Sequence, residues 1–187
     1  LVGSEMCIRD RLKVFKNISV SKFSGYKFLN LFFDYLKKNK KKSVFCIDPN
    51  IKFSKSNKNL LKSFGVEKIN NYLAPKYDTK NISDKKLLIK IQKAKPDFIL
   101  TNIGGGKQEI LGLYLKKNLK IKSTILCTGA AISFFTKDQA PINILIDQLY
   151  LGWFVRLIFN PLIFLKRYFY SLKLVPMVIY NKIVIIN

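Results

Sequence analysis

The sequence predicts an α/β fold in which a parallel sheet is flanked by helices and is followed by a C-terminal appendage of aromatic and basic helical sequence. Two observations predict the sheet domain. Short apolar runs of strand type alternate with segments whose apolar residues recur at helical spacing, and the connections between them are short. This pattern indicates a parallel sheet with helices on both faces. Hydrophobic residues make up 49% of the 187 residues, which is enough to form a buried core.

Each predicted strand is a short apolar run bounded by turn signals, such as Asp48-Pro49-Asn50 after the first run. The predicted helices show apolar residues at helical spacing. Gly65 ends the second helix in the C′ role, and Ser83 is the expected N-cap of the third. The expected strands are 43–47, 68–73, 97–101 and 123–128, and the expected helices are 25–39, 56–64, 83–94 and 107–118.

Three segments are expected along the chain. Residues 1–11 (LVGSEMCIRDR) lack the apolar stretch of a signal peptide and resemble a translated adaptor, so we expect a non-native leader and a missing natural N-terminus. Residues 12–140 are expected to form the α/β domain, incomplete at its N-terminus. Residues 141–187 are expected to form a helical appendage that associates with a membrane.

The net charge of +23 suggests a polyanionic partner, but nearly all of the excess is lysine. Codon bias in an A/T-rich genome and a preference for anionic surfaces both account for it. Nucleic-acid-binding proteins usually combine basic residues with a known module. The sequence has no zinc-finger spacing, no RNP-like aromatic motif and no KH-type glycine loop, so we expect no nucleic-acid partner.

The chain has three cysteines and no histidine, which excludes histidine-dependent catalytic triads and His-ligated zinc within it. The odd number of cysteines argues against a disulfide framework. No cysteine or carboxylate set has metal-ligand spacing, so we predict no metal site and no cofactor. Cys46 and Cys127 lie in strand-like runs and are expected to be buried, reduced thiols.

The segment from Asp97 to Glu109 is a strand, a glycine turn and a helix start. Backbone N–H groups at such a turn favour anionic oxygens, and ligands of Rossmann-like sheets bind outside the carboxyl ends of the strands. Gly104, Gly105, Gly106 and Lys107 are therefore candidate phosphate-binding residues. An ordinary strand-to-helix turn is the alternative interpretation, since the segment is neither GxGxxG nor a Walker loop.

An ordered set of motifs between about residues 95 and 170 is similar to the WecG/TagA/CpsF glycosyltransferase family. GGGKQE at 104–109 resembles the family's G-x-P-K-Q-E, with Gly106 in place of proline, and GAAISF at 129–134 resembles G-G-A-F-D-F, with Ser133 in place of aspartate. QAP at 139–141 resembles R-A-P, and LGWFVRL at 151–157 resembles L-E-W-L-Y-R-L. Asn160-Pro161 and Arg167-Tyr168 follow in the family's order.

A weaker resemblance lies upstream. SKFSGYK at 21–27 resembles the family's R-x-x-G-x-D element, with Lys22 for arginine, Gly25 for glycine and Lys27 for aspartate. The family's earlier segment, which holds an aspartate thought to act as general base, has no counterpart here.

The resemblance implies a bacterial enzyme that transfers an N-acetylmannosamine-type sugar from a UDP donor to a lipid-diphosphate-linked acceptor, in cell-surface polysaccharide or teichoic acid biosynthesis. It implies catalytic roles for Gln108 and Lys22. The same resemblance suggests substrate binding by the glycine turn, by Gly129, Ala130 and Ser133, and by the guanidinium groups of Arg156 and Arg167. Solvation or interfacial anchoring is the alternative for the two arginines.

The aromatic and basic appendage would suit a bilayer interface, which implies a cytoplasmic protein held peripherally on the inner face of the membrane. A pair of helices that covers the core is the alternative. Two other functions stay open: a non-catalytic nucleotide-sugar-binding homologue, in view of Lys27, Gly106 and Ser133, and a basic nucleic-acid-binding protein. The sequence leaves open whether the chain forms a homo-oligomer.

Overall fold

The structure is a computed structural model that describes residues 17, 24–78, 82–136, 138, 151–172, 176 and 180. These residues fall into two compact units, of which the first takes Ser24–Pro141. The second includes the described residues from 151 onward.

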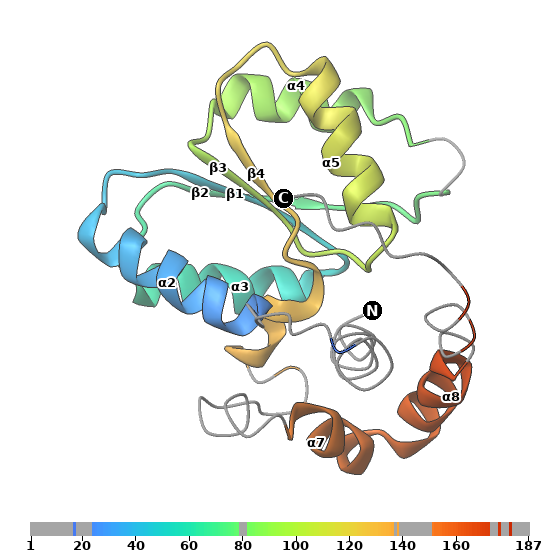
Figure 1. The fold of residues 1–187 in the computed structure, drawn as a ribbon. Coiled ribbons are helices and arrows are strands. Elements are labelled where there is room, and N and C mark those ends of the chain that lie inside the picture. Colours follow the sequence, from blue (N-terminus) through green and yellow to red (C-terminus); the bar gives the residue numbers. More distant parts are fainter. Residues whose placement is uncertain are drawn as a thin grey trace. The chain divides into compact units, whose positions relative to one another are not determined.

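The first unit is built on four parallel strands, which confirms the predicted α/β fold (Figure 1). The strands are β1 (Val44–Asp48), β2 (Ile69–Leu73), β3 (Phe98–Thr101) and β4 (Thr124–Leu126), and their order across the sheet is β2-β1-β3-β4. The chain moves outward from β1 to β2 and then crosses back to β3. The strand order therefore reverses between β1 and β3, where sheets of this kind bind ligands.

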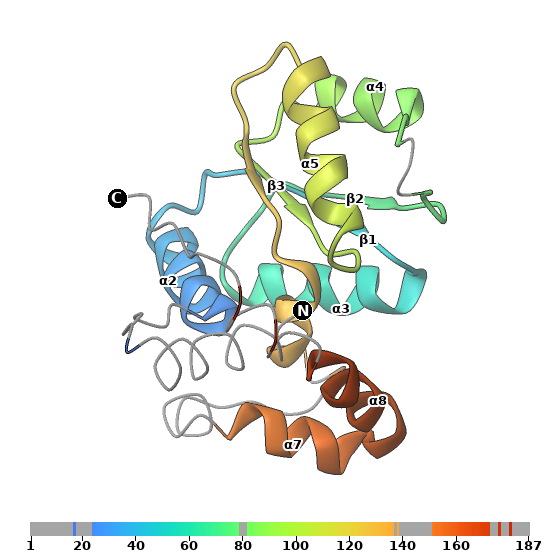
Figure 2. The same cartoon turned by 45° about the vertical axis from the view of Figure 1, so that its right-hand side comes forward.

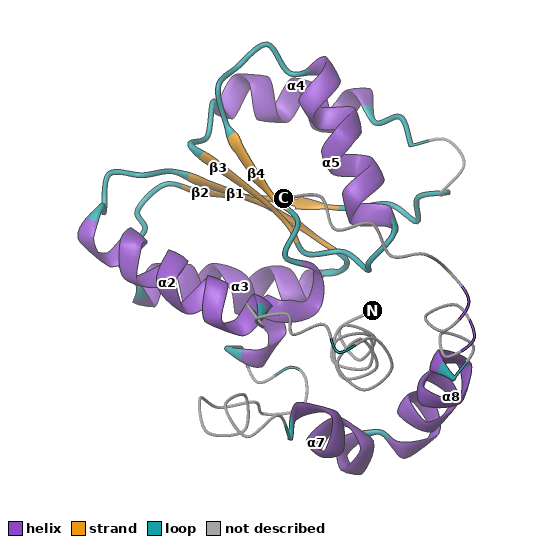
Figure 3. Ribbon diagram, in the orientation of Figure 1, coloured by secondary structure: helices purple, strands orange, loops and turns teal. Residues whose placement is uncertain are grey.

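Helices cover both faces of this sheet (Figure 3). On one face lie α2 (Gly25–Lys38) and α3 (Ile51–Ser63), and on the other lie α4 (Lys85–Ala94) and α5 (Lys107–Asn118). Figure 2 shows the same division after rotation. A short 3-10 helix, η1 (Gly129–Phe134), follows β4 and contacts α2 and α3.

Because side chains point alternately to the two faces of the sheet along each strand, a hydrophobic core forms on each face. Phe45 and Ile47 of β1 pack with Ile99 of β3 against α4 and α5. The intervening side chains face the other helices, as the edge-to-face contact of Phe98 with Phe32 of α2 shows at 5.1 Å between ring centroids. The sheet is thus buried on both faces, which accounts for the continuous apolar runs in its central strands.

The predicted strands and helices are all present, but two helix starts differ from expectation. The α3 helix begins at Ile51, five residues before the predicted start, because Asn50 caps it by accepting the Phe53 N–H at 3.1 Å. The N-cap of α4 is Asp84 rather than Ser83, with the Leu87 N–H donating to its carboxylate at 2.9 Å. Gly65 has φ +82°, as its predicted role after α3 requires.

One of the two cysteines agrees with expectation and the other does not. Cys46 is fully buried in β1, and burial raises the pKa of its thiol well above the ordinary value. Cys127 is exposed, so its predicted burial is wrong: β4 ends at Leu126, one residue before it. Both are free cysteines.

Between residues 151 and 172 the second unit forms the helices α7 (Gly152–Phe159) and α8 (Pro161–Ser171), which pack on each other. The break at Asn160 follows from Pro161, which occupies the first turn of α8 and has no N–H to continue α7. No helix within the described parts of the chain is long and apolar enough to cross a membrane.

Candidate functional site

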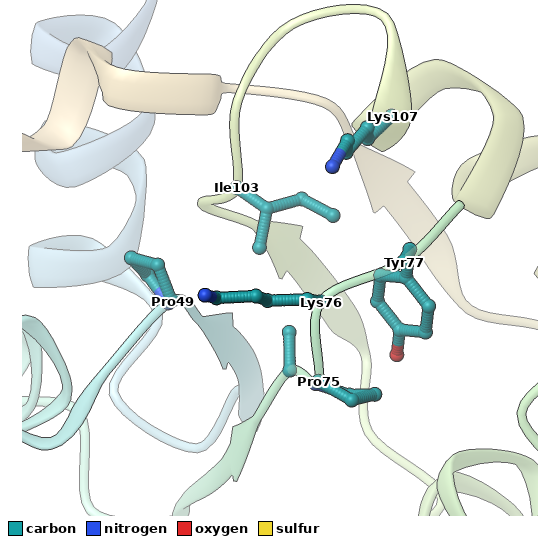
Figure 4. Close-up of a pocket in the computed structure, with 7 residues that line it drawn as sticks. Pro49, Pro75, Lys76, Tyr77, Ile103 and Lys107 are labelled. Carbon is teal, nitrogen blue, oxygen red and sulfur yellow. The ribbon is translucent and has the colours of Figure 1, made fainter. Parts of the chain in front are cut away.

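A cavity of about 270 Å³ lies at the carboxyl ends of β1, β2 and β3, where the strand order reverses. Three segments that each follow a strand contribute to its lining. Their positions match the general rule for ligand sites in open parallel sheets. The lining residues are Pro49, Ala74, Pro75, Lys76, Tyr77, Ile103 and Lys107 (Figure 4).

Two lysines make this cavity positive. Lys107 is the first residue of α5, so its ammonium adds to the partial positive charge of the helix N-terminus. Lys76 comes from the segment after β2, and in Figure 4 its side chain extends toward Pro49. Apolar walls with a few cations suit an anionic ligand that carries a flat or apolar part.

Tyr77 contributes its ring to the cavity, because its hydroxyl is engaged elsewhere. The hydroxyl donates to Asp84 at 2.7 Å, and the Tyr72 hydroxyl donates to the same carboxylate oxygen at 2.8 Å. Burial, followed by the hydrogen bond and charge of Asp84, raises the pKa of both phenols, that of Tyr72 to about 12. Asp84 thereby fixes the wall of the cavity from the N-terminus of α4.

The glycine turn beside the cavity is open. A Cβ atom built at Gly104 or Gly106 would meet nothing within 4 Å, so a ligand could approach the backbone closely. Gly106 has φ +85°, and its N–H donates to Glu109 at 2.6 Å. Proline could adopt neither feature, which gives a physical reason for the departure from the family's proline at this position.

Glu109 occupies the position at the helix N-terminus where a phosphate would be expected. Burial raises the pKa of its carboxyl, but hydrogen bonds from Gln108 and Gly106 outweigh this effect and hold the pKa below the usual value. An anionic ligand that takes the Gly106 N–H must therefore displace this carboxylate.

Gln108 joins the two predicted loops. It is buried, and its Nε2 donates to Glu109 Oε1 at 2.9 Å. A Cβ built at Gly129 would lie 3.1 Å from that Nε2, so the start of η1 rests against the Gln108 amide. The Oε1 atom of Gln108 has no hydrogen-bond partner among the described residues. Both loops thus lie at the carboxyl edge of the sheet, as the sequence interpretation requires.

The other predicted site residues are placed less favourably or fall outside the description. Ser133 is 3% exposed and does not line the cavity, and Ala130 lies in η1. Arg156 lies on α7 and Arg167 on α8, with side chains outside the described set. Lys22 and the 139–141 element also lie outside the described residues. Gly25 is described, at the start of α2, and a Cβ atom built on it would lie 3.2 Å from the Cβ of Ala131.

Sequence reasoning identified Lys107 but missed Pro49, Lys76, Tyr77 and Ile103 as lining residues. A usable signal was present. Pro75-Lys76-Tyr77 directly follows β2, and the carboxyl ends of parallel strands share one edge of a sheet. Because β2 (INNYL) has a weak apolar pattern, the sequence alone marks the end of this strand poorly.

The model of the Glycosyl transferase WecG/TagA/CpsF family matches residues 6–184. No curated protein and no solved structure matches this chain. The family match covers nearly the whole chain, including the strands and loops that form the cavity. The chain therefore belongs to the WecG/TagA/CpsF family of glycosyltransferases.

Proposed function

We propose that this glycosyltransferase uses a UDP-sugar donor, with the nucleotide held at the carboxyl edge of the sheet. The observation that carries the proposal is the cavity at the carboxyl ends of β1, β2 and β3, with Lys76 and Lys107 in its lining. A departing UDP gains negative charge, so the site needs cations and N–H donors near the diphosphate. These two lysines and the N-terminus of α5 provide that combination.

The size of the cavity limits what it can hold. Its volume of about 270 Å³ is near the lower bound of ligand pockets, about 300 Å³. It would therefore take one part of the nucleotide rather than a whole UDP-sugar. The remainder would pass over the open backbone of Gly104 and Gly106.

The direct experiment is a calorimetric titration of the protein with UDP. Lys107→Ala is expected to weaken UDP binding about tenfold, because one charge-assisted contact is lost. Lys117→Ala is the matched control, since Lys117 is an exposed lysine in the last turn of the same helix. Equal weakening by both variants would indicate general attraction by the +23 charge and would refute the site.

For the reaction, we propose transfer of an N-acetylmannosamine-type sugar to a lipid-diphosphate-linked acceptor of a bacterial cell-surface polymer. The support is family membership, together with Gln108 beside the glycine turn. We also propose a catalytic role for Gln108 and substrate contacts for Arg156 and Arg167. Product analysis with UDP-N-acetylmannosamine and UDP-N-acetylglucosamine as competing donors tests the sugar, and omission of the lipid acceptor tests the second substrate.

A lipid-linked acceptor requires the enzyme to reach a bilayer surface, and α8 offers a suitable face. Leu162, Leu165, Phe169 and Leu172 are all more than half exposed and are spaced at three- and four-residue intervals, so they form one apolar stripe. Exposed Lys166 lies on the same helix. We therefore propose peripheral association with the inner face of the membrane through this stripe.

The membrane proposal is tested by sedimentation with anionic vesicles. The Leu162→Asp, Phe169→Asp double variant should lose most of its vesicle binding, whereas Lys117→Ala should retain it. Vesicle binding by the double variant equal to that of the unmodified protein would show that α8 is not the docking element.

The non-catalytic alternative draws on the substitutions at Lys27, Gly106 and Ser133. It predicts UDP binding without turnover in a protein extended at its N-terminus. Sugar transfer by that longer protein would exclude it. Nucleic-acid binding has only the net charge in its favour, and RNA affinity that vanishes at physiological salt would exclude that alternative.

A further inference from the structure

A buried polar cluster lies next to the cavity and centres on Asp48, the last residue of β1. Asp48 is fully buried, and its carboxylate accepts three hydrogen bonds from asparagine amides. Asn57 Nδ2 of α3 donates to Oδ1 at 2.7 Å, and Asn102 Nδ2 donates to the same oxygen at 2.8 Å. Asn71 Nδ2 of β2 donates to Oδ2 at 2.8 Å.

Through Asn102 the cluster also reaches the segment that follows β4. The Thr128 hydroxyl, two residues after β4, donates to Asn102 Oδ1 at 3.0 Å. One carboxylate therefore connects α3, β2, the residue after β3 and, through Asn102, the residue that precedes η1. Among the described ion pairs none involves Asp48, and within the same part of the chain its carboxylate is held by asparagine amides.

Asn57 joins α3 to the carboxylate, and the two branches through Asn71 and Asn102 lead to different places. The Asn71 branch ends in β2 and on the Ser54 carbonyl of α3, at 3.4 Å. The Asn102 branch leads to the site: Asn102 directly precedes Ile103 of the cavity and the Gly104–Gly106 turn, and Thr128 directly precedes Gly129. Pro49, next to Asp48, also lines the cavity.

A buried charge held by several donors is a rigid anchor, because moving any donor away leaves the carboxylate under-solvated. We propose that Asp48 is a positioning residue for the donor site: through Asn102 and Thr128 it fixes the glycine turn relative to the start of η1. The predicted effect on donor binding rests on the proposed function. The coupling of the two loops is independent of that proposal.

The test compares variants on the two branches by amide hydrogen exchange. Asp48→Asn and Asn102→Ser should increase exchange about tenfold or more in both loop segments, 103–108 and 128–134. Asn71→Ser is the matched control, because it removes a donor from the same carboxylate but leaves the Asn102 branch intact. It should leave exchange in both segments unchanged.

Thr128→Val is a milder variant that keeps the test usable if Asp48→Asn or Asn102→Ser fails to fold, since it removes only the hydroxyl at the end of the Asn102 branch. It should increase exchange in 128–134 and leave β2 and α3 unchanged. If Asp48→Asn, Asn102→Ser and Thr128→Val affect the two loop segments no more than Asn71→Ser does, the positioning role is refuted.

UDP titration of the same variants separates this inference from the proposed function. UDP binding should weaken about tenfold in Asp48→Asn and Asn102→Ser, the effect of losing one strong contact, and should be unchanged in Asn71→Ser. A protein that binds no UDP in its unmodified form would refute the donor proposal, while the exchange comparison would still decide the coupling. Loosened loops with unchanged UDP affinity would refute the role of Asp48 in the donor site.

Discussion

The two edges of the sheet each carry a carboxylate that joins β1 to β3, but the carboxylates are held differently. At the amino edge, Asp97 accepts hydrogen bonds from Lys42 Nζ and from the Ser43 N–H and hydroxyl, each at 2.8 Å, and its side chain is 34% exposed. At the carboxyl edge, Asp48 is fully buried and is held by uncharged amides.

The difference bears on the proposed site, because only the carboxylate at the carboxyl edge is held by residues that lead into the cavity lining. The partly exposed ion pair at the amino edge holds two strand starts together. The buried cluster at the carboxyl edge holds loops that surround a cavity. A buried carboxylate is the costlier arrangement, and its position beside the candidate site suggests that it serves loop placement.

The largest effect is expected from removal of the buried carboxylate. Asp48→Ala leaves two buried amide groups and one partly buried amide group without their acceptor and should lower the free energy of unfolding by about 3 kcal/mol. Urea denaturation measures it. Asp34→Ala, which removes an exposed carboxylate from α2, is the control and should have little effect. A loss below about 1 kcal/mol for Asp48→Ala would contradict the comparison.

An intermediate effect is expected at the glycine turn. Gly106→Pro removes the N–H that donates to Glu109 and cannot adopt φ +85°, so it should lower the free energy of unfolding by about 2 kcal/mol. Gly104→Ala, at a position with equally open surroundings and no positive φ, should be nearly neutral. Equal stability of the two variants would show that the turn readily adopts the conformation that the family's proline requires.

The smallest effect is expected at the amino edge. The hydrogen bond from Lys42, followed by those from Ser43, lowers the pKa of Asp97 to about 2. Because this pKa lies below the unfolded value of about 3.9, the stabilisation is complete above pH 4 and is lost as the pH falls toward 2. Solvent screening at a one-third exposed side chain reduces it to about 1 kcal/mol.

Asp97→Asn should therefore be less stable than the unmodified protein at pH 7 and equal to it near pH 2. Thermal unfolding at several pH values measures the difference. A difference that does not change between pH 7 and pH 2 would show that the carboxylate charge is not the cause.

Much of the fold was predictable because its signals are local. Helix α5 was predicted to the residue, since a glycine turn and a lysine-rich helix end bound a clear pattern, and β3 begins one residue later than predicted, at Phe98. The start of α3 was missed because its first turn, IKFSK, shows little helical periodicity and the deciding contact is a single cap from Asn50. Cys127 was misjudged because burial depends on where β4 ends.

The site was only partly predictable because its contacts are long-range. Lys107, Gln108 and Gly129 were found from motifs along the chain. The cluster around Asp48 was not found, because Asn71 and Asn102 come next to it only once β2 and β3 flank β1. No spacing in the sequence encodes that strand order.

The central claim is that the carboxyl edge of the sheet binds the nucleotide of the donor. Mapping of amide chemical shifts by NMR during a UDP titration tests it most directly. The largest shifts are expected at residues 74–77 and 103–107, with little change at Lys42, Ser43 and Asp97 on the opposite edge. Shifts spread over the surface lysines or centred on the amino edge, or none at all, would contradict the claim.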